Sequence, residues 1–198
     1  MISKIENFKN EKLKEFMLSV MHNKEIEEPF KKHPGSIQIH HNWISGLLQH
    51  TYEVVRICEL CGELFPELDK DLTISGAILH DIGKIKEVEV TTRIKGTKKG
   101  QLKGHIVQGA LMVSAMLEKS NLDDETKDKL LHIILSHHGT KENGSPKEPM
   151  TAEAFAVYLA DLMSSQLSHI IEFIKENREL TKDEFMYHYQ SKRNILLK

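Results

Sequence analysis

Cysteine is scarce in this sequence: only Cys58 and Cys61 occur in 198 residues. One pair is too few to hold together a small secreted scaffold, so a disulfide-rich extracellular protein is excluded and the reducing cytoplasm is the expected location. The two cysteines lie three residues apart, about one helical turn. No second Cys or His pair follows at zinc-finger spacing, so we expect core packing rather than a redox pair or half of a zinc site.

An excess of charge is also lacking. Lys and Arg number 27 and Asp and Glu number 29, which gives a net charge of −2 with neutral histidines. A chain that holds nucleic acid by bulk positive charge alone is therefore excluded, although a local basic patch is not. Aromatic residues make up only 6% of the chain, so a platform on which bases could stack is not evident.

Long apolar runs are missing too. No stretch approaches the roughly 18 consecutive apolar residues that a membrane span needs, and charged and apolar residues alternate at the N-terminus. We therefore expect neither a signal peptide nor a membrane anchor, and no membrane partner. Hydrophobic residues at 39% and charged residues at 28% are typical of a soluble globular protein.

Helical periodicity dominates what is present. Apolar residues return every three or four positions in the predicted helices, which are 8–21, 47–64, 71–81, 106–117, 126–136, 151–174 and a short terminal helix over 181–190. The segment 88–103 is rich in β-branched residues, Gly and Lys, and it is the one good β-hairpin candidate, with its turn at 96–100.

The sequence therefore predicts a single all-α domain with a small β-hairpin insertion. No repeat, low-complexity tract or flexible linker divides the chain. We expect a helical extension over 1–30, a core over 31–176 and a helical tail over 177–198.

Histidine is unusually abundant, with 12 residues. Five of the histidines and two aspartates fall within or at the ends of five predicted helices, at positions where apolar neighbours point inward. They are His50, His80, Asp81, His105, His137, His138 and Asp161. A buried imidazole or carboxylate without a partner costs on the order of several kcal/mol, so a common compensating group is expected. Each histidine alone would more often be a hydrogen-bonded core residue, but the joint pattern favours a metal centre inside the bundle.

Seven ligands are too many for one ion. A single octahedral ion takes about six ligands and must leave room for water and substrate. If Asp81 bridges two ions, one takes His50, His80 and Asp161, and the other takes His105, His137 and His138. Two ions roughly 3.5–4 Å apart can hold a bridging hydroxide and clamp a phosphoryl oxygen. Imidazole with carboxylate suits Mn, Fe, Co, Ni or Zn better than Mg or Ca, without choosing among them.

This order of ligands, with the run His80-Asp81-Ile82-Gly83-Lys84, resembles the HD-domain metal-dependent phosphohydrolase superfamily. Its simpler members show only the equivalents of His50, His80, Asp81 and Asp161 and hold one metal. The additional His105 and His137-His138 resemble the two-metal branch. In that branch, cyclic-di-GMP phosphodiesterases carry a Gly-Tyr-Pro signature after the paired histidines, whereas this chain has Gly139 and then Gly144-Ser145-Pro146-Lys147. Cyclic-di-GMP is therefore not the expected substrate.

Within the superfamily, the sequence resembles the HD domain of bacterial 3′→5′ exoribonucleases of the CMP-binding-factor type. The resemblance covers about 32–166 and rests on 40–50, 79–84, 104–106, 132–139 and 144–147. Those exoribonucleases also carry an N-terminal oligonucleotide-binding barrel, and here only a short segment of helical character precedes the core. The resemblance therefore implies the catalytic chemistry more strongly than the RNA substrate.

Three residues are candidate substrate contacts. Lys84 follows Asp81 by about one helical turn, and the resemblance implies that it contacts the scissile phosphate or protonates the leaving oxygen. Asp81 and Lys84 are thus the candidate catalytic residues, although Lys84 could also be a solvated lysine at a helix C-terminus. His41 at the pocket rim and Lys147 after the paired histidines complete the set. Six basic residues between 86 and 103 are either a solvated face or a guide for a polyanion.

The expected function is metal-dependent hydrolysis of a nucleotide phosphodiester, with the 3′ end of a short single-stranded RNA as one substrate. A nucleotide phosphomonoesterase or a cyclic-nucleotide phosphodiesterase would use the same apparatus. A non-catalytic nucleotide or nucleic-acid sensor that kept the fold is a third alternative. All seven ligands and Lys84 are present, which favours an enzyme. Oligomeric state does not follow from the sequence.

Overall fold

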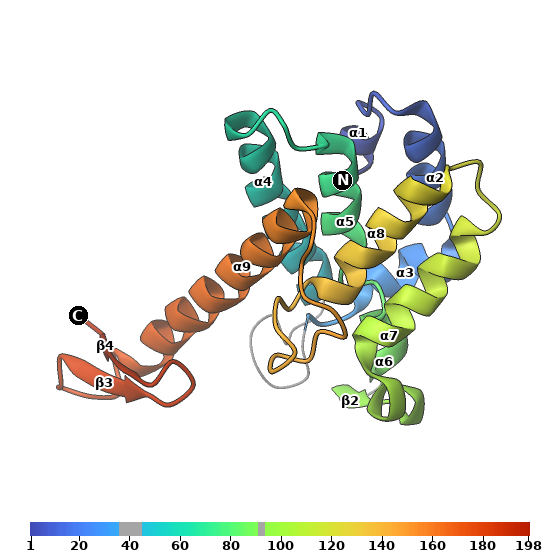
Figure 1. Ribbon diagram of the computed structural model, residues 1–198. Helices are drawn as coiled ribbons and strands as arrows, with labels where there is room; N and C mark the ends of the chain where they lie inside the picture. Colours follow the sequence, from blue (N-terminus) through green and yellow to red (C-terminus); the bar gives the residue numbers. More distant parts are fainter. Residues whose placement is uncertain (36–44, 91–93) are drawn as a thin grey trace.

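The computed structural model describes residues 1–35, 45–90 and 94–198, and helices dominate it (Figure 1). The helices are α1 (Ile2–Ile5), α2 (Glu11–Met21), α3 (Lys24–Lys32), α4 (Gly46–Leu64), α5 (Lys70–Leu79), α6 (Lys84–Glu87), α7 (Lys98–Leu117), α8 (Asp124–Ser136) and α9 (Ala152–Asn177). The described strands form two antiparallel hairpins, β1 (Val88–Val90) with β2 (Ile94–Gly96) and β3 (Phe185–His188) with β4 (Arg193–Leu196). The predicted all-α class with a small hairpin insertion is confirmed. None of the described helices is long and apolar enough to cross a membrane.

Side-chain caps determine where several helices begin. Asn10, Asp69, Asp123 and Thr151 each accept a hydrogen bond from the backbone N–H three residues further on. A cap of this kind satisfies one of the backbone donors that a helix leaves free at its start. The capping residues therefore set the register of α2, α5, α8 and α9.

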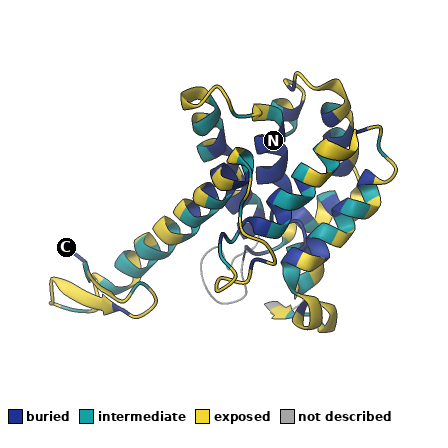
Figure 2. Ribbon diagram, viewed as in Figure 1, coloured by how far each residue is buried: buried dark blue, intermediate teal, exposed yellow. Residues whose placement is uncertain are grey.

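Helix α5 is the central helix of the bundle. It is buried at every position from Leu72 to Leu79 and packs against α4, α8 and α9 (Figure 2). Gly76 permits the close approach of α8, because an added Cβ there would lie 2.6 Å from Cγ2 of Ile133. The C-terminal end of α5, where His80 and Asp81 follow, is consequently in the interior.

A second close approach joins the segment after α5 to α7. A Cβ added to Gly83 would lie 2.0 Å from the carbonyl oxygen of His105 and 2.5 Å from the backbone nitrogen of Gly109. Helix α7 is interrupted at Gly104, whose φ of 70° is in the left-handed region that favours glycine. These two glycines place His105 opposite the end of α5.

The predicted position of the first hairpin turn is wrong. Val88 pairs with Gly96, so 96–100 is not the turn between the strands. Thr97 instead caps α7 by accepting a hydrogen bond from the backbone N–H of Gly100. Gly100 is required there for another reason, because a Cβ would lie 2.4 Å from the carbonyl oxygen of Glu87.

The predicted terminal helix over 181–190 is also wrong, and the tail over 177–198 is not helical beyond α9. Strands β3 and β4 form a hairpin there, and Lys192 in the connection has a φ of 52°. The His188 ring packs edge-on against His169 and Phe173 of α9, with centroid distances of 4.7 and 4.6 Å. The hairpin is thus stabilised by contacts with a distant helix face rather than by local helical periodicity.

Candidate metal centre

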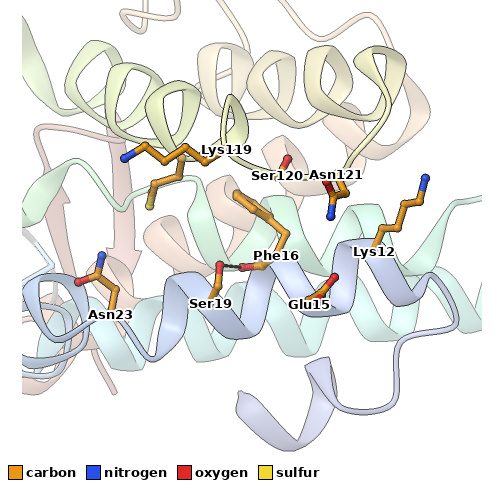
Figure 3. A pocket seen from close by; sticks show the side chains of 9 residues that line it. Lys12, Glu15, Phe16, Ser19, Asn23, Lys119, Ser120 and Asn121 are labelled. Atoms are coloured by element: carbon orange, nitrogen blue, oxygen red, sulfur yellow. Dashed lines mark hydrogen bonds between the residues drawn. The ribbon is translucent and has the colours of Figure 1, made fainter.

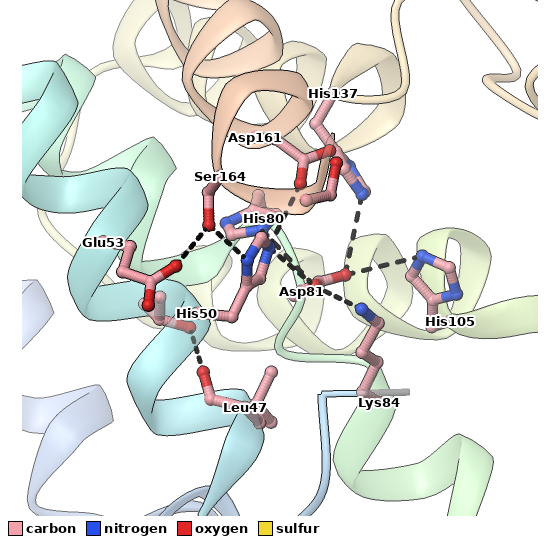
Figure 4. A network of polar contacts seen from close by, with 12 residues as sticks. Leu47, His50, Glu53, His80, Asp81, Lys84, His105, His137, Asp161 and Ser164 are labelled. Carbon is pink, nitrogen blue, oxygen red and sulfur yellow. Dashed lines mark hydrogen bonds and ion pairs between the residues drawn. The ribbon is translucent and has the colours of Figure 1, made fainter. Parts of the chain in front are cut away.

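The fold brings all seven predicted metal ligands together, and Figure 4 labels all of them except His138. His50 is in α4 and Asp161 is in α9, while His80 and Asp81 follow α5 directly, His137 and His138 follow α8, and His105 follows the interruption of α7. Five separate parts of the chain therefore supply the cluster. His50, His80, Asp81 and His137 are almost fully buried.

The potential ligand atoms form two groups. His50, His80 and Asp81 offer atoms within 4.8 Å of one another, and so do His105, His137 and His138. Asp161 belongs with the first group, since its Oδ1 lies 3.1 Å from Nε2 of His50. Each group could hold a metal ion.

Asp81 lies between the two groups. Its Oδ2 is 3.6 Å from Nε2 of His50 and 3.4 Å from Nε2 of His80. Its Oδ1 is 3.5 Å from Nε2 of His105 and 3.7 Å from Nε2 of His137. One carboxylate oxygen thus faces each group.

Three of the histidines are oriented by backbone carbonyl groups. Nδ1 of His80 lies 2.8 Å from the carbonyl oxygen of Ala77, and Nδ1 of His137 lies 2.7 Å from that of Ile134. Nδ1 of His138 lies 2.9 Å from the carbonyl oxygen of Asn143. A carbonyl oxygen can only accept, so Nδ1 carries the hydrogen in each ring. In the neutral imidazole, Nε2 then has no hydrogen, and its lone pair is available to bind a metal ion.

The other two histidines are oriented by side chains. Nδ1 of His105 lies 3.2 Å from Oε2 of Glu87, a carboxylate. Nδ1 of His50 lies 3.0 Å from Oγ of Ser164, whose hydroxyl donates to Oε2 of Glu53 at 2.7 Å. Because Ser164 gives its one hydrogen to Glu53, it accepts from His50. All five rings therefore share one tautomer.

This common tautomer concentrates lone pairs in the interior. Five Nε2 atoms and two carboxylates face one another, and Nε2 of His50 is only 3.3 Å from Nε2 of His80. Asp81 Oδ1, His105 Nε2 and His137 Nε2 are buried and have no hydrogen-bond partner among the described residues. A cation between these atoms would compensate them. The donor set of imidazole nitrogens and carboxylate oxygens fits a divalent transition metal.

The electrostatics favour an ionised Asp81. Burial opposes ionisation of this carboxyl, but the adjacent Lys84 ammonium holds the pKa of Asp81 below its usual range. Burial lowers the pKa of His137 and His138, which favours the neutral, ligating form of these rings.

Lys84, a predicted catalytic residue, lies at the edge of the cluster. Its Nζ is 2.6 Å from Oδ2 of Asp81, and its side chain is 13% exposed. Lys147 is exposed, and in the described part of the chain no contact joins its side chain to the ligands. His41, the third predicted substrate contact, lies outside the described residues.

The side chains that orient His50 and His105 were not predicted from the sequence. Ser164 follows Asp161 by three residues, Glu53 follows His50 by three, and Glu87 follows Lys84 by three. This spacing, which places two residues on one helix face, is the only signal in the sequence that pointed to them.

A hollow between α2 and the end of α7 shares no residue with the cluster. Its volume is about 410 Å³, and it is lined by Lys12, Glu15, Phe16, Ser19, Asn23, Met116, Lys119, Ser120 and Asn121. The Ser19 hydroxyl donates to the carbonyl oxygen of Phe16 in its own helix (Figure 3). This hollow offers no group of metal ligands comparable to the cluster.

Comparison with known proteins decides the family. The family model of the HD domain matches residues 47–166, more than half of the chain. The chain belongs to the HD-domain family. The resemblance to HD-domain phosphohydrolases stated above is thereby confirmed, and the match lies inside the predicted core of 31–176.

Curated relatives of this HD protein carry the name 3′-5′ exoribonuclease YhaM. The protein from Bacillus subtilis is 37% identical over 145 residues, which cover 73% of this chain and 46% of the relative. Those from Listeria welshimeri and Bacillus pumilus are each 34% identical, over 78% and 82% of this chain and 50% and 56% of the relatives. The HD protein thus spans about half the length of these relatives. No solved structure matches it.

Proposed function

We propose that this HD protein is a metal-dependent phosphohydrolase that holds two divalent transition-metal ions and cleaves a nucleotide phosphodiester. The observation that carries the proposal is the shared tautomer of five histidines, which turns five Nε2 lone pairs toward two carboxylates. The position of Asp81, with one oxygen toward each group, supports two ions rather than one.

The proposed ligands divide as the two groups do. The first ion takes His50, His80, Asp81 and Asp161, and the second takes Asp81, His105, His137 and His138. Octahedral ions would each keep about two positions for water and substrate. Manganese, iron, cobalt, nickel and zinc all suit these ligands. When bound, such ions supply an activated water and stabilise the charge that develops on a phosphoryl group.

The protein's own residues fix the geometry and the charge. Asp81 stays ionised between the groups because the Lys84 ammonium favours its carboxylate. The Lys84 ammonium, 2.6 Å from Asp81, is close enough to the cluster to contact a phosphate oxygen or to protonate the leaving oxygen. The proposed catalytic residues are therefore Asp81 and Lys84, with His41 and Lys147 as further proposed substrate contacts.

The proposed substrate is the 3′ end of a short single-stranded RNA. The name of the YhaM relatives supports this choice, because their similarity covers about three quarters of this chain. A nucleotide phosphomonoester or a cyclic nucleotide is the alternative substrate for the same metal centre. The test must therefore compare these substrates directly.

The decisive assay uses metal-loaded protein with a 5′-labelled RNA oligonucleotide and, separately, with mononucleotides and cyclic nucleotides. We expect a ladder shortened from the 3′ end, with mononucleotides as products. Asp81→Asn should reduce the rate by at least about 100-fold, because the shared ligand loses its charge. Asp124→Asn is the matched control, since the Asp124 side chain is 98% exposed and far from the ligands in the sequence.

Two results would contradict the proposal. Asp81→Asn protein that cleaves RNA as fast as the Asp124→Asn protein would exclude the metal centre as the source of activity. Release of phosphate from mononucleotides without cleavage of RNA would replace the proposed substrate by a phosphomonoester.

A further inference from the structure

His138 lies where the chain leaves the interior of the bundle for its surface. It is half-buried, whereas His137, one residue earlier, is fully buried, and residues 141–144 are all exposed. Figure 2 shows most of the segment between α8 and α9 in the colour of exposed residues. The packed core therefore surrounds the His138 ring only in part, and the loop that follows has to supply the rest of its support.

Residues 139–145 close this loop with hydrogen bonds of their own, and we call them the clasp. The carbonyl oxygen of Thr140 accepts from the backbone N–H groups of Asn143 at 3.2 Å and of Ser145 at 3.1 Å. Asn143 contacts His138 twice. Its carbonyl oxygen accepts from Nδ1 of the ring at 2.9 Å, and its side-chain amide donates to the His138 carbonyl oxygen at 3.3 Å. The orientation of the His138 ring therefore depends on where the clasp lies.

The clasp is joined to α9 by the ring of Tyr158. Gly139, the first residue of the clasp, has a φ of 82°, and a Cβ added to it would lie 2.6 Å from Cδ2 of Tyr158 and nearer still to Cε2 and Cζ. The aromatic ring thus packs directly on the backbone that follows His138. Glycine permits both this left-handed conformation and this close approach.

Tyr158 lies beside a ligand of the other group. It precedes Asp161 by three residues on α9, so the two side chains are on the same side of the helix. An aromatic ring offers a large contact area and has only two side-chain torsions, which makes it a rigid support. Helix α9 therefore carries one proposed ligand of the first ion and, in Tyr158, a support for one proposed ligand of the second.

We propose that Tyr158 is a positioning residue for the second ion and acts through the clasp on His138. Its ring prevents the clasp from moving toward α9. The carbonyl group of Asn143 then stays on Nδ1 of His138, and the ring stays beside His105 and His137, with centroid distances of 5.2 and 4.5 Å. The effect on metal affinity rests on the proposed two-ion function, whereas the orientation of the ring does not.

The tautomer of His138 in the metal-free chain tests this role directly. Long-range proton–nitrogen NMR spectra show which ring nitrogen carries the hydrogen. We expect the Nδ1–H form in the wild type and in Tyr158→Phe, since ring carbons make the contact with Gly139. Tyr158→Ala should populate the Nε2–H form as well, because the Asn143 carbonyl group no longer holds the hydrogen on Nδ1.

Calorimetric titration with Mn²⁺ measures the consequence for the second ion. Tyr158→Ala should raise the dissociation constant of one of two binding events by about 10–100-fold, as the loss of an orienting group around a metal ligand does. In a His138→Ala chain the same substitution should change nothing further, because its effect passes through His138. Phe155→Ala is the matched control. Phe155 is an aromatic residue of the same helix that is 50% exposed, and this variant should bind both ions as the wild type does.

Gly139→Ala is a second variant, because its methyl group must displace the Tyr158 ring from the other side of the same contact. It should change the tautomer and the second dissociation constant in the same direction as Tyr158→Ala. Circular dichroism identifies which of the two variants is folded and can be interpreted.

Three results would overturn the inference. The first is an unchanged tautomer and affinity in a folded Tyr158→Ala or Gly139→Ala chain. The second is a Tyr158→Phe chain that behaves like Tyr158→Ala, and the third is a further loss of affinity when Tyr158→Ala is added to His138→Ala. A single binding event in the wild type would instead contradict the two-ion proposal, and the tautomers of the metal-free chain would still decide the role of Tyr158.

Discussion

At the scale of single residues, the five histidines differ in what holds their Nδ1 hydrogen. His80, His137 and His138 donate to backbone carbonyl groups, which no substitution removes. His50 and His105 donate to side chains, Ser164 and Glu87. The orientation of these two rings is therefore open to mutation without touching a ligand.

Ser164→Ala should weaken metal binding at the first group. Without its hydroxyl, Nδ1 of His50 loses its acceptor and Glu53 loses a donor, so the Nε2-ligating tautomer is no longer enforced. Loss of such an orienting partner typically lowers metal affinity by about 10–100-fold. Calorimetric titration with Mn²⁺ should show one of two binding events weakened by this amount.

Ser165→Ala is the control, because the Ser165 hydroxyl donates to the carbonyl oxygen of Leu162. Equal affinities in the two variants would refute a role for Ser164.

The sequence alone was sufficient to single out the residues of the cluster but not the residues that orient their rings. Histidines and aspartates at inward positions of several helices are recognisable by type and spacing. Ser164 is an ordinary small residue until α4 and α9 are packed together, because its partner His50 is 114 residues away. Such a contact depends on the register of two helices, which local spacing does not determine.

At the scale of elements, the position of α7 depends on Gly83. The atoms that an added Cβ would meet, 2.0 and 2.5 Å away, belong to the backbone of α7 and cannot rotate aside. Gly83→Ala must push α7, and His105 with it, away from Asp81. We expect a loss of about 1–3 kcal/mol in the free energy of unfolding, as in other overpacked cores, measured by urea denaturation.

Gly62→Ala provides the control for this substitution. A Cβ at Gly62 would meet only the flexible side chain of Lys70, at 3.3 Å, and alanine is the better helix former. This variant should be as stable as the wild type or more stable. If Gly83→Ala proves equally harmless, the close approach of α7 to the segment after α5 is wrong.

The hydrogen bond between His132 and the loop after α8 should make the stability of the protein depend on pH. Its Nε2 accepts a hydrogen bond of 2.9 Å from the backbone N–H of Met150, and burial, together with Lys147, lowers its pKa. The unfolded chain therefore binds this proton more readily, and the contribution to stability is present above a pH of about 6.5 and lost as the pH falls. We expect His132→Ala to cost about 1 kcal/mol at neutral pH and progressively less in acid. If the difference in unfolding free energy between the wild type and His132→Ala does not change with pH, this prediction is contradicted.

The elements that the sequence predicts best are those with long amphipathic patterns, such as α4, α8 and α9. The errors fall on short segments. The segment 96–100, where a turn is predicted, instead leads into α7, in which Gly100 contacts the backbone of Glu87, and the second hairpin depends on the contact of His188 with α9. Both contacts are formed only once the surrounding helices are in place, so local preference did not reveal them.

At the scale of the whole molecule, the metal centre should be a major source of stability. Four of the seven proposed ligands are almost fully buried, and they come from parts of the chain that lie far apart in the sequence. An ion that binds only the folded chain stabilises it by about 4 kcal/mol when its concentration is 1,000 times its dissociation constant. Removal of metal by a chelator should therefore lower the Tm of the wild type and of Asp124→Asn, and Mn²⁺ should restore it. For Asp81→Asn the response to Mn²⁺ should be much smaller, and an equal response would contradict a shared ligand.

The resemblance of the sequence to the HD family covers about residues 32–166, which include the bundle core and the proposed ligands. The family match covers residues 47–166 of the same region. Residues 167–198 are outside the match, and the exposure of the second half of α9 becomes evident only when this helix is seen to leave the bundle. Apolar residues four apart are read as a buried face in a sequence, because most such faces are buried. Exposure of a helix face is a property of the whole molecule.

The most direct test of the metal centre is anomalous diffraction from crystals grown with Mn²⁺. We expect two anomalous peaks roughly 3.5–4 Å apart, one on each side of the Asp81 carboxylate. One peak should be surrounded by His50, His80 and Asp161, and the other by His105, His137 and His138. A single peak, or histidine rings whose Nε2 atoms point away from the scatterers, would contradict a two-ion centre bridged by Asp81.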